Sequence, residues 1–183
     1  MRSTDDLRHE HRVILVVLTG MEGMASGLEQ GRSLRRDEAE KVIEILRVFV
    51  DKCHHGKEER HLFKALEAHG MSRGSGPLAL MMKEHEEGRA HVRVLVQAMP
   101  GAVEGSSQAR SDYAEHTRAY VILLRAHIKK ENGVIFPMAE RMLSEEDDAK
   151  LSEAFEAIEH DEIGEGAHEK YREWAQELAS RGQ

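Results

Sequence analysis

The chain has little of several things that proteins commonly use, and each shortage excludes something. It contains one cysteine, Cys53, so it forms no internal disulfide and fits a reducing compartment. Only 4% of its 183 residues are aromatic, so no large aromatic core is available. Its apolar runs are far shorter than the roughly 18 residues that a membrane-spanning helix needs. We therefore expect a soluble cytoplasmic protein with no membrane segment.

Positive charge is also in short supply. The chain has 26 Lys and Arg residues against 34 Asp and Glu, which gives a formal net charge of −8. Because phosphate binding needs a basic surface, this balance argues against a nucleic-acid partner. Residues 1–11 are polar and lack the apolar core of a signal peptide. A chain of this length predicts one domain with a sizeable buried core.

Apolar residues recur at helical spacing in five parts of the chain, and no useful stretch alternates as a β-strand does. Residues 101–108 read as a loop, and Ser144 followed by acidic residues predicts the cap of the last helix. The expected helices cover about 3–28, 36–69, 75–99, 109–143 and the segment from 145 onward, the last interrupted by Gly164 and Gly166.

Short connections between the first four helices favour antiparallel packing. The predicted fold class is therefore all-α, an up-down antiparallel four-helix bundle with an additional C-terminal helix. We divide the chain into the bundle, residues 1–143, and a C-terminal helical extension packed on it, residues 144–183.

Two His–Glu pairs with a spacing of four stand in the middle of long helical patterns. They are His55 with Glu59, and His127 with Glu131. Residues i and i+4 lie on one face of an α-helix, so each pair offers an imidazole nitrogen and a carboxylate oxygen to the same small volume. Two such pairs on facing helices are the way a helical bundle builds a dinuclear metal site in its core.

The second helix contains two overlapping pairs of this kind, because His54 and Glu58 have the same spacing as His55 and Glu59. On an α-helix of regular pitch, Glu59 lies one turn before apolar residues. The pair His54–Glu58 shares its side with charged residues and reads as a solvated face. We therefore choose His55 and Glu59 as the pair that faces the core.

Histidines on the apolar stripes of the first and third helices complete a cluster. The expected metal ligands are His11, His55, Glu59, His85, His127 and Glu131. An unpaired charge in a helical core is strongly unfavourable, so glutamates on apolar stripes need cations to meet them. Imidazole and carboxylate ligands suit iron, manganese or zinc, and the lack of thiolates argues against a cysteine-rich zinc site.

Four segments, residues 7–14, 54–63, 82–89 and 127–137, resemble the hemerythrin-like (HHE cation-binding) family in its bacterial single-domain branch. The order His, HxxxE, His, HxxxE carries this resemblance across residues 7–140. It implies an up-down four-helix bundle around two non-haem iron ions, with an oxo or hydroxo bridge and with zinc or manganese as substitutes. Carried over by position, Glu59 and Glu131 bridge the irons, and the four histidines are terminal ligands.

The sequence departs from the oxygen-carrying members of that family. They have a second histidine four residues after the third-helix histidine, where this chain has Arg89, and their fourth helix has aspartate five residues on, where this chain has Glu131 at four. One histidine fewer implies a more open iron rather than simple reversible oxygen carriage. His168 lies in a segment that resembles one found after the bundle in this branch, and we interpret it as structural.

These features predict a non-haem di-iron protein that binds or senses a small molecule: O2, NO or H2O2. One alternative is a di-iron enzyme that consumes peroxide, as a catalase does, or donates iron for iron–sulfur repair. A second alternative is a metal reservoir or a metal-gated interaction module. The sequence identifies no protein partner.

Overall fold

The structure is a computed structural model that describes residues 1–164 and 166–181. The remaining positions, 165, 182 and 183, belong to the expected C-terminal extension and lie outside the described residues. In chain order the elements are α1 (Arg2–Glu29), α2 (Arg36–Glu44), η1 (Ile45–His55), η2 (Glu58–Leu62), α3 (Phe63–Ala68), α4 (Gly76–Glu104), α5 (Ser107–Lys130), η3 (Glu131–Ile135), α6 (Phe136–Met142), α7 (Glu145–Ile158), η4 (Glu159–Ile163) and α8 (Ala167–Arg181), where η marks a π-helical segment.

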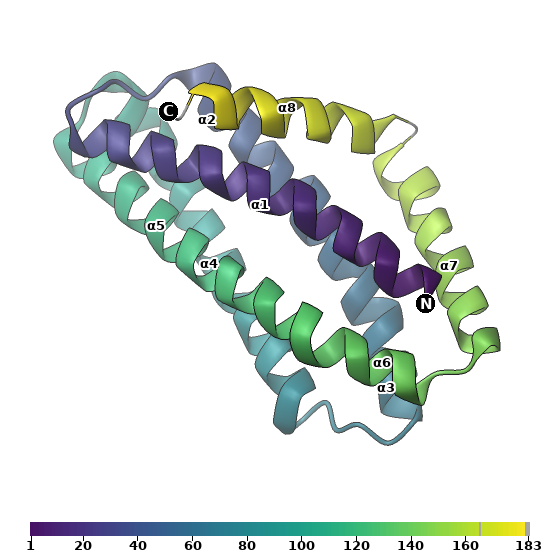
Figure 1. Cartoon of the computed structure of the whole chain (residues 1–183). Helices are drawn as coiled ribbons and strands as arrows, with labels where there is room; N and C mark the ends of the chain where they lie inside the picture. Colours follow the sequence, from purple (N-terminus) through teal and green to yellow (C-terminus); the bar gives the residue numbers. More distant parts are fainter. Residues whose placement is uncertain (165, 182–183) are drawn as a thin grey trace.

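Four long helical rods alternate in direction and form the bundle (Figure 1). The first rod is α1, the second runs from α2 through α3, the third is α4, and the fourth runs from α5 through α6. The rod α5 packs against both α1 and α4, and α2 packs against α4. The described residues contain no β-strand. The predicted all-α bundle with an additional C-terminal helix is confirmed.

The connection between the third and fourth rods is shorter than predicted. The helix α4 does not end near Pro100 but continues to Glu104, and only Gly105 and Ser106 separate it from α5. Pro100 is exposed, whereas Ala98 and Ala102 beside it are buried. Packing of that buried face therefore holds the helix through a residue that cannot donate a backbone hydrogen bond. Gly105, at φ 96°, then ends the helix in the left-handed conformation.

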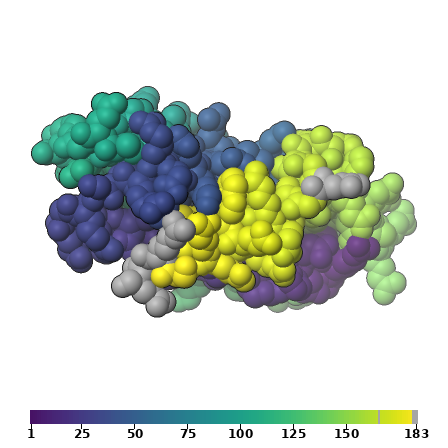
Figure 2. Space-filling model, turned by 90° about the horizontal axis from the view of Figure 1, so that it is seen from above, coloured from purple at the N-terminus to yellow at the C-terminus, as the bar shows by residue number. Residues whose placement is uncertain are grey.

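The C-terminal segment forms two helices, α7 and α8, and they are separated at the interruption expected at Gly164 and Gly166. The Ser144 hydroxyl accepts a hydrogen bond from the Asp147 backbone N–H, and the Asp147 carboxylate accepts one from the Ser144 backbone N–H, so the predicted cap is confirmed as a capping box. Gly164 and Gly166 adopt φ of 86° and 77° and break the chain between α7 and α8. The helix α7 packs beside the start of α1, and α8 runs back along α1 (Figures 1 and 2).

The contact between α1 and α8 depends on a glycine. A Cβ atom at Gly20 would lie 2.8 Å from the backbone carbonyl carbon and the Cβ of Leu178 in α8. We expect Gly20→Ala to lower the free energy of unfolding by about 1–3 kcal/mol, because α8 has to shift outward. Urea denaturation measures this change. Gly133→Ala is the matched control, because nothing lies within 4 Å of its Cβ position. Equal stability of both variants would contradict the close packing of α8 on α1.

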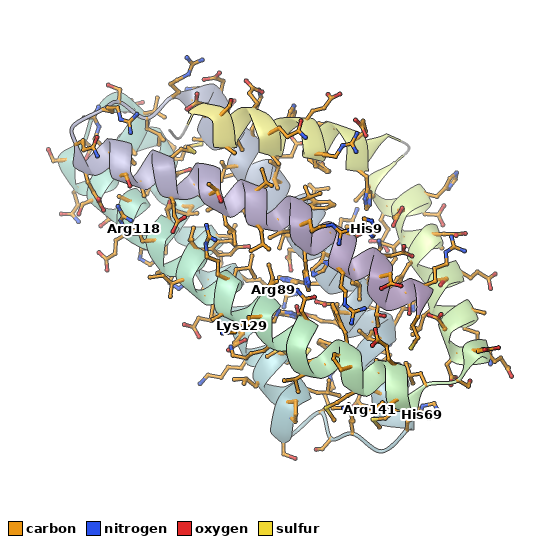
Figure 3. The ribbon with its side chains drawn as sticks, in the orientation of Figure 1. His9, His69, Arg89, Arg118, Lys129 and Arg141 are labelled. Atoms are coloured by element: carbon orange, nitrogen blue, oxygen red, sulfur yellow. The ribbon has the colours of Figure 1, made fainter. Side chains whose placement is uncertain are left out.

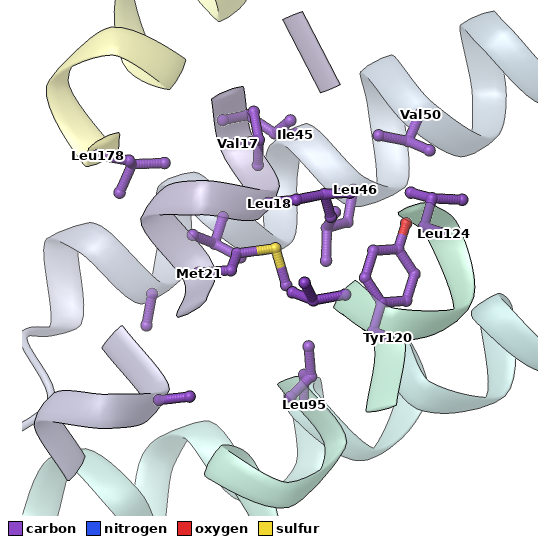
Figure 4. Close-up of a cluster of buried hydrophobic side chains, with 14 of the residues drawn as sticks. Val17, Leu18, Met21, Ile45, Leu46, Val50, Leu95, Tyr120, Leu124 and Leu178 are labelled. Carbon is purple, nitrogen blue, oxygen red and sulfur yellow. The ribbon is translucent and has the colours of Figure 1, made fainter. Parts of the chain in front are cut away.

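The apolar core consists of two clusters at different heights of the bundle. The larger contains Leu18, Met21, Leu46, Tyr120 and their neighbours (Figure 4). The smaller is built around Leu62, Phe63, Ile135 and Phe136 near the other end. Along each rod, polar residues separate the part in one cluster from the part in the other: for example, His11 lies between Leu7 and Ile14. The two clusters therefore enclose a polar layer between them.

Candidate metal centre

Seven histidine and glutamate side chains form the polar layer, and each is at most 4% exposed. Their potential ligand atoms fall into two groups, and within each group all atoms lie within 4.8 Å of one another. The first group is His55, Glu58, His85 and His127, and the second is His11, His54, Glu58 and Glu131. Glu58 belongs to both groups and thus lies where the two meet.

The structure brings together five of the six expected ligands and leaves out the sixth. His11, His55, His85, His127 and Glu131 all lie in the two groups. Glu59 is in neither: its carboxylate pairs with Arg89 at 2.7 Å and with His85 Nδ1 at 2.6 Å, on the outer side of that imidazole.

Glu58 and His54 occupy the interior in its place. The expectation that they face solvent is wrong, because they are 0% and 1% exposed. His54 also raises the number of imidazoles in the two groups to five. Arg89 (Figure 3) stands where the oxygen-carrying members of the resembling family have a second histidine on the third helix. Its side chain reaches Asp51 and Glu59.

The π-helical segments explain this shift in register. The second rod is π-helical over Ile45–His55, which contains both histidines, and again over Glu58–Leu62, which contains both glutamates. In a π-helix the hydrogen bonds run from i to i+5, so each turn holds more residues than an α-turn. A stripe drawn at α-helical spacing therefore drifts around the rod. By the level of the polar layer, the inward face contains His54, His55 and Glu58.

Several atoms of this layer are buried without any hydrogen-bond partner in the part of the chain that the structure describes. They are Nε2 of His11 and His55 and both carboxylate oxygens of Glu58 and Glu131. Buried polar atoms are nearly always satisfied, and a buried carboxylate with no partner is strongly unfavourable. Imidazole nitrogen and carboxylate oxygen are ligands of iron, manganese and zinc. The residues present therefore fit a pair of metal cations.

The outer nitrogens of the five imidazoles are held by acceptors, which orients the inner nitrogens. In each case Nδ1–H donates to a side-chain oxygen: His11 to Asn132 (3.0 Å), His54 to Glu10 (2.7 Å), His55 to Asp51 (3.4 Å), His85 to Glu59 (2.6 Å) and His127 to Glu84 (2.9 Å). Such partners set the tautomer and the ring orientation of metal-binding histidines. When Nδ1 carries the proton in this way, a neutral imidazole directs the lone pair of its Nε2 to the interior.

Distances across the interior show how closely these groups converge. His127 Nε2 lies 3.0 Å from both His85 Nε2 and Glu131 Oε1, and His11 Nε2 lies 3.1 Å from Glu131 Oε2. Glu58 has one oxygen 3.6 Å from His54 Nε2 and the other 3.5 Å from His85 Nε2. The two glutamates thus each present one oxygen to either side of the centre.

Burial governs the protonation of this layer when no cation is bound. It lowers the pKa of His54 to about 4 and that of His55 well below 6.5, so both imidazoles are neutral at pH 7. Burial also lowers the pKa of His127, but attraction to Glu131 and Glu84 outweighs it and raises the pKa to about 9. Burial and the facing carboxylate of Glu131 raise the pKa of Glu58 well above 4.5.

A second polar network lies behind His54 and involves the C-terminal helices. Glu10, which orients His54, is also paired with the fully buried Lys57 at 2.5 Å, and Lys57 is paired with Glu159. Burial opposes ionisation of Glu10, but His54 and Lys57 lower its pKa to about 2. His168 is in neither ligand group and lies 3.7 Å from Glu10 and from Glu159. Through this network, the segment after the bundle contacts the partner of a core histidine.

The fold and the polar layer together define a helical-bundle protein with a histidine- and glutamate-lined metal-binding core. The Hemerythrin HHE cation binding domain matches residues 2–139, and the chain therefore belongs to this family. The family resemblance seen in the sequence is confirmed. In the described part of the chain, no helix is long and apolar enough to cross a membrane.

The chain is also similar to curated proteins whose names describe no function. Three uncharacterized proteins, one from Mycobacterium bovis and two from strains of Mycobacterium tuberculosis, are each 25% identical to the chain over 165 residues. The match covers 88% of this chain but 62% of each relative, so the chain spans about three fifths of their length. No solved structure matches the chain.

Proposed function

We propose that the protein holds two non-haem iron ions between the four rods. The proposed ligands are His11, His54, His55, Glu58, His85, His127 and Glu131, with Glu59 as a hydrogen-bond partner of His85 rather than a ligand. The observation that supports this most strongly is the set of buried and unsatisfied atoms, Nε2 of two histidines and four carboxylate oxygens, that converge on one volume. Zinc or manganese suits the same ligands.

The shared position of Glu58 and the two-sided placement of Glu131 support both carboxylates as bridges. When bound, the iron pair supplies redox chemistry, an oxo or hydroxo bridge and a position for a small ligand. The residues of the chain hold the imidazoles in one tautomer through their Nδ1 partners. The apolar clusters above and below exclude bulk water.

Within this framework, the proposed function is to bind or sense a small oxygen-derived or diatomic ligand: O2, NO or H2O2. The proposed compartment is the cytoplasm, which agrees with a single cysteine that is unpaired and buried. The proposed binding partner at the metal centre is one of these small molecules.

Metal analysis combined with a visible spectrum tests this function. We expect about two iron ions per chain, and a visible band that forms in air and disappears with dithionite. Gas evolution from added peroxide at catalytic rates would favour the enzyme alternative. A colourless protein that holds zinc and shows no redox response would contradict the proposal and favour a reservoir or an interaction module.

A further inference from the structure

A cavity of about 170 Å³ lies beside the proposed metal centre, between η1, α4 and α5. Exposed Arg47 and Arg93 lie at its outer side, and buried His55 and Tyr120 line its inner end. The volume accommodates a molecule of a few heavy atoms together with a few waters, at roughly 30 Å³ per water. The cavity therefore connects the surface with the imidazole of a proposed ligand.

The charges around this cavity favour an anion. Three arginines, Arg47, Arg89 and Arg93, line it, against the single carboxylate of Asp51. Arg89 adds no net positive charge, because it pairs at 2.7 Å with each of three carboxylates, those of Asp51, Glu59 and Glu86. Neither Arg47 nor Arg93 forms an ion pair with any described residue. Two uncompensated guanidinium groups thus face one mouth on a chain whose net charge is −8. Such a local positive potential attracts and concentrates small anions.

The inner end offers one hydrogen-bond donor without a partner, while His55 Nε2 directs its lone pair to the proposed metal centre. The Tyr120 hydroxyl, on a side chain that is 2% exposed, forms no hydrogen bond within the described chain and remains available as a donor. Gly88 lines the cavity beside the Tyr120 ring, and a Cβ there would make an ordinary van der Waals contact with that ring at 3.4 Å. The cavity thus combines a positive mouth with hydrogen-bonding capacity inside.

We propose that this cavity binds a compact monovalent anion with oxygen or nitrogen donor atoms and delivers it to the metal centre. Hydroperoxide, superoxide and nitrite belong to this class, and they are the charged relatives of the neutral ligands named above. The inference rests on the proposed function for its destination. It adds the ligand class and the residues that select it: Arg47 and Arg93 for charge, and Tyr120 for hydrogen bonding.

Azide is a suitable probe, because it is a compact monoanion that changes the visible spectrum of ferric centres on binding. We expect Arg47→Gln/Arg93→Gln to raise the azide dissociation constant of the iron-loaded protein about tenfold at low salt, since each exposed charge contributes modestly. The difference should shrink as salt screens the arginines. Arg36→Gln/Arg141→Gln is the control, because it removes the same net charge from exposed positions outside the cavity.

Nitric oxide is a small and neutral ligand, so its binding does not depend on the charge of the arginines. It therefore shows whether the substitutions act through the lost charge or through a changed shape of the cavity. Its affinity for the ferrous protein should be the same in the wild type and in Arg47→Gln/Arg93→Gln. An unchanged azide affinity in this variant at low salt would overturn the inference. An equal loss of azide and nitric oxide affinity would overturn it too, because the arginines would then act through the shape of the cavity.

Metal-free protein makes the inference testable even if the proposed iron centre is wrong. In an NMR titration with azide, the Gly88 and Tyr120 amide signals of the unloaded wild type should shift with saturation. They should shift much less in Arg47→Gln/Arg93→Gln. If the protein does not load iron but these shifts appear, the iron centre is rejected and the anion cavity is supported. If the protein loads iron but shows neither the shifts nor an effect of the arginine substitutions, the iron centre is supported and the anion cavity is rejected.

Discussion

Glu58→Ala is expected to lose one or both metal ions, whereas Glu59→Ala is expected to keep both. Glu58 belongs to both ligand groups, and neither of its oxygens has a hydrogen-bond partner in the described residues. Glu59 pairs with the outer nitrogen of His85 and with Arg89, and it belongs to neither ligand group. Loss of such an outer partner typically costs about 10–100-fold in metal affinity, which still permits loading at high affinity. Metal content per chain, measured on both purified variants, checks this result.

Matched substitutions separate ligand loss from misfolding. Glu58→Gln and Glu59→Gln preserve side-chain volume, and circular dichroism establishes whether each variant retains its helices. The pair His54→Ala and His55→Ala extends the test, because both imidazoles lie in the ligand groups and both variants should lose metal. Retention of metal by Glu58→Gln together with its loss from Glu59→Gln would show that the α-helical register chosen from the sequence describes the centre after all.

The sequence predicted those parts of the structure that depend on local periodicity. The positions of the four rods follow from apolar spacing, and the start of α7 follows from Ser144 and the acidic residues after it. His11, His85 and His127 were placed inward because they share stripes with apolar residues on α-helical segments, where the assumed pitch holds. Prediction succeeded where the helix is regular.

It failed in one place where the backbone departs from the α-helix, in the second rod. His54, His55, Glu58 and Glu59 lie in or beside two π-helical segments, so the assumed pitch selects the wrong glutamate for the interior. Glu58 and Glu59 each follow a histidine at identical spacing in the sequence, and only the three-dimensional course of the rod shows that Glu58 is the buried one. Frequent occurrence of π-segments at functional sites was the one available hint.

The partners of the imidazoles were beyond sequence reasoning for a different reason. Glu10 reaches His54 from another rod, and Glu84 reaches His127 from across the bundle. Contacts of this kind depend on how rods pack, which periodicity within one rod does not determine. The same holds for Lys57, whose sequence position suggests a solvated side chain but whose ammonium group lies buried between two glutamates.

Removal of the metals is expected to destabilise the protein, and increasingly so as the pH rises from 6.5 to about 8.5. In the unloaded state, burial and Glu131 raise the pKa of Glu58 well above its ordinary 4.5, and the pKa of His127 is raised from 6.5 to about 9. In this window the folded chain therefore binds more protons than the unfolded chain. Under that condition the free energy of unfolding falls as the pH rises, by up to about 1.4 kcal/mol per pH unit for each group.

Other buried histidines do not reverse this sign in the chosen window. The pKa of His54 is lowered to about 4, and that of His55 also lies well below 6.5. These two histidines therefore lower the free energy of unfolding only as the pH falls below about 6.5, and their effect on it is nearly constant above that pH. In the loaded protein, the cations compensate the carboxylates, and stability should vary little between pH 6.5 and about 8.5. Thermal and urea unfolding of both forms across this range measure the difference in the free energy of unfolding between the loaded and the unloaded protein.

Glu58→Gln provides the matched control for this pH dependence. Its neutral amide cannot ionise, so the unloaded variant keeps only the His127 contribution, and its stability should fall with a shallower slope than that of the unloaded wild type. At pH 8 and above, we expect the unloaded variant to be the more stable of the two, because it no longer buries a carboxyl group whose ionisation is opposed by burial and by Glu131. If the unloaded wild type were as stable as the loaded form throughout the window, the layer would not depend on cations. If Glu58→Gln left the slope unchanged, the carboxylate of Glu58 would not be the group that the cations neutralise.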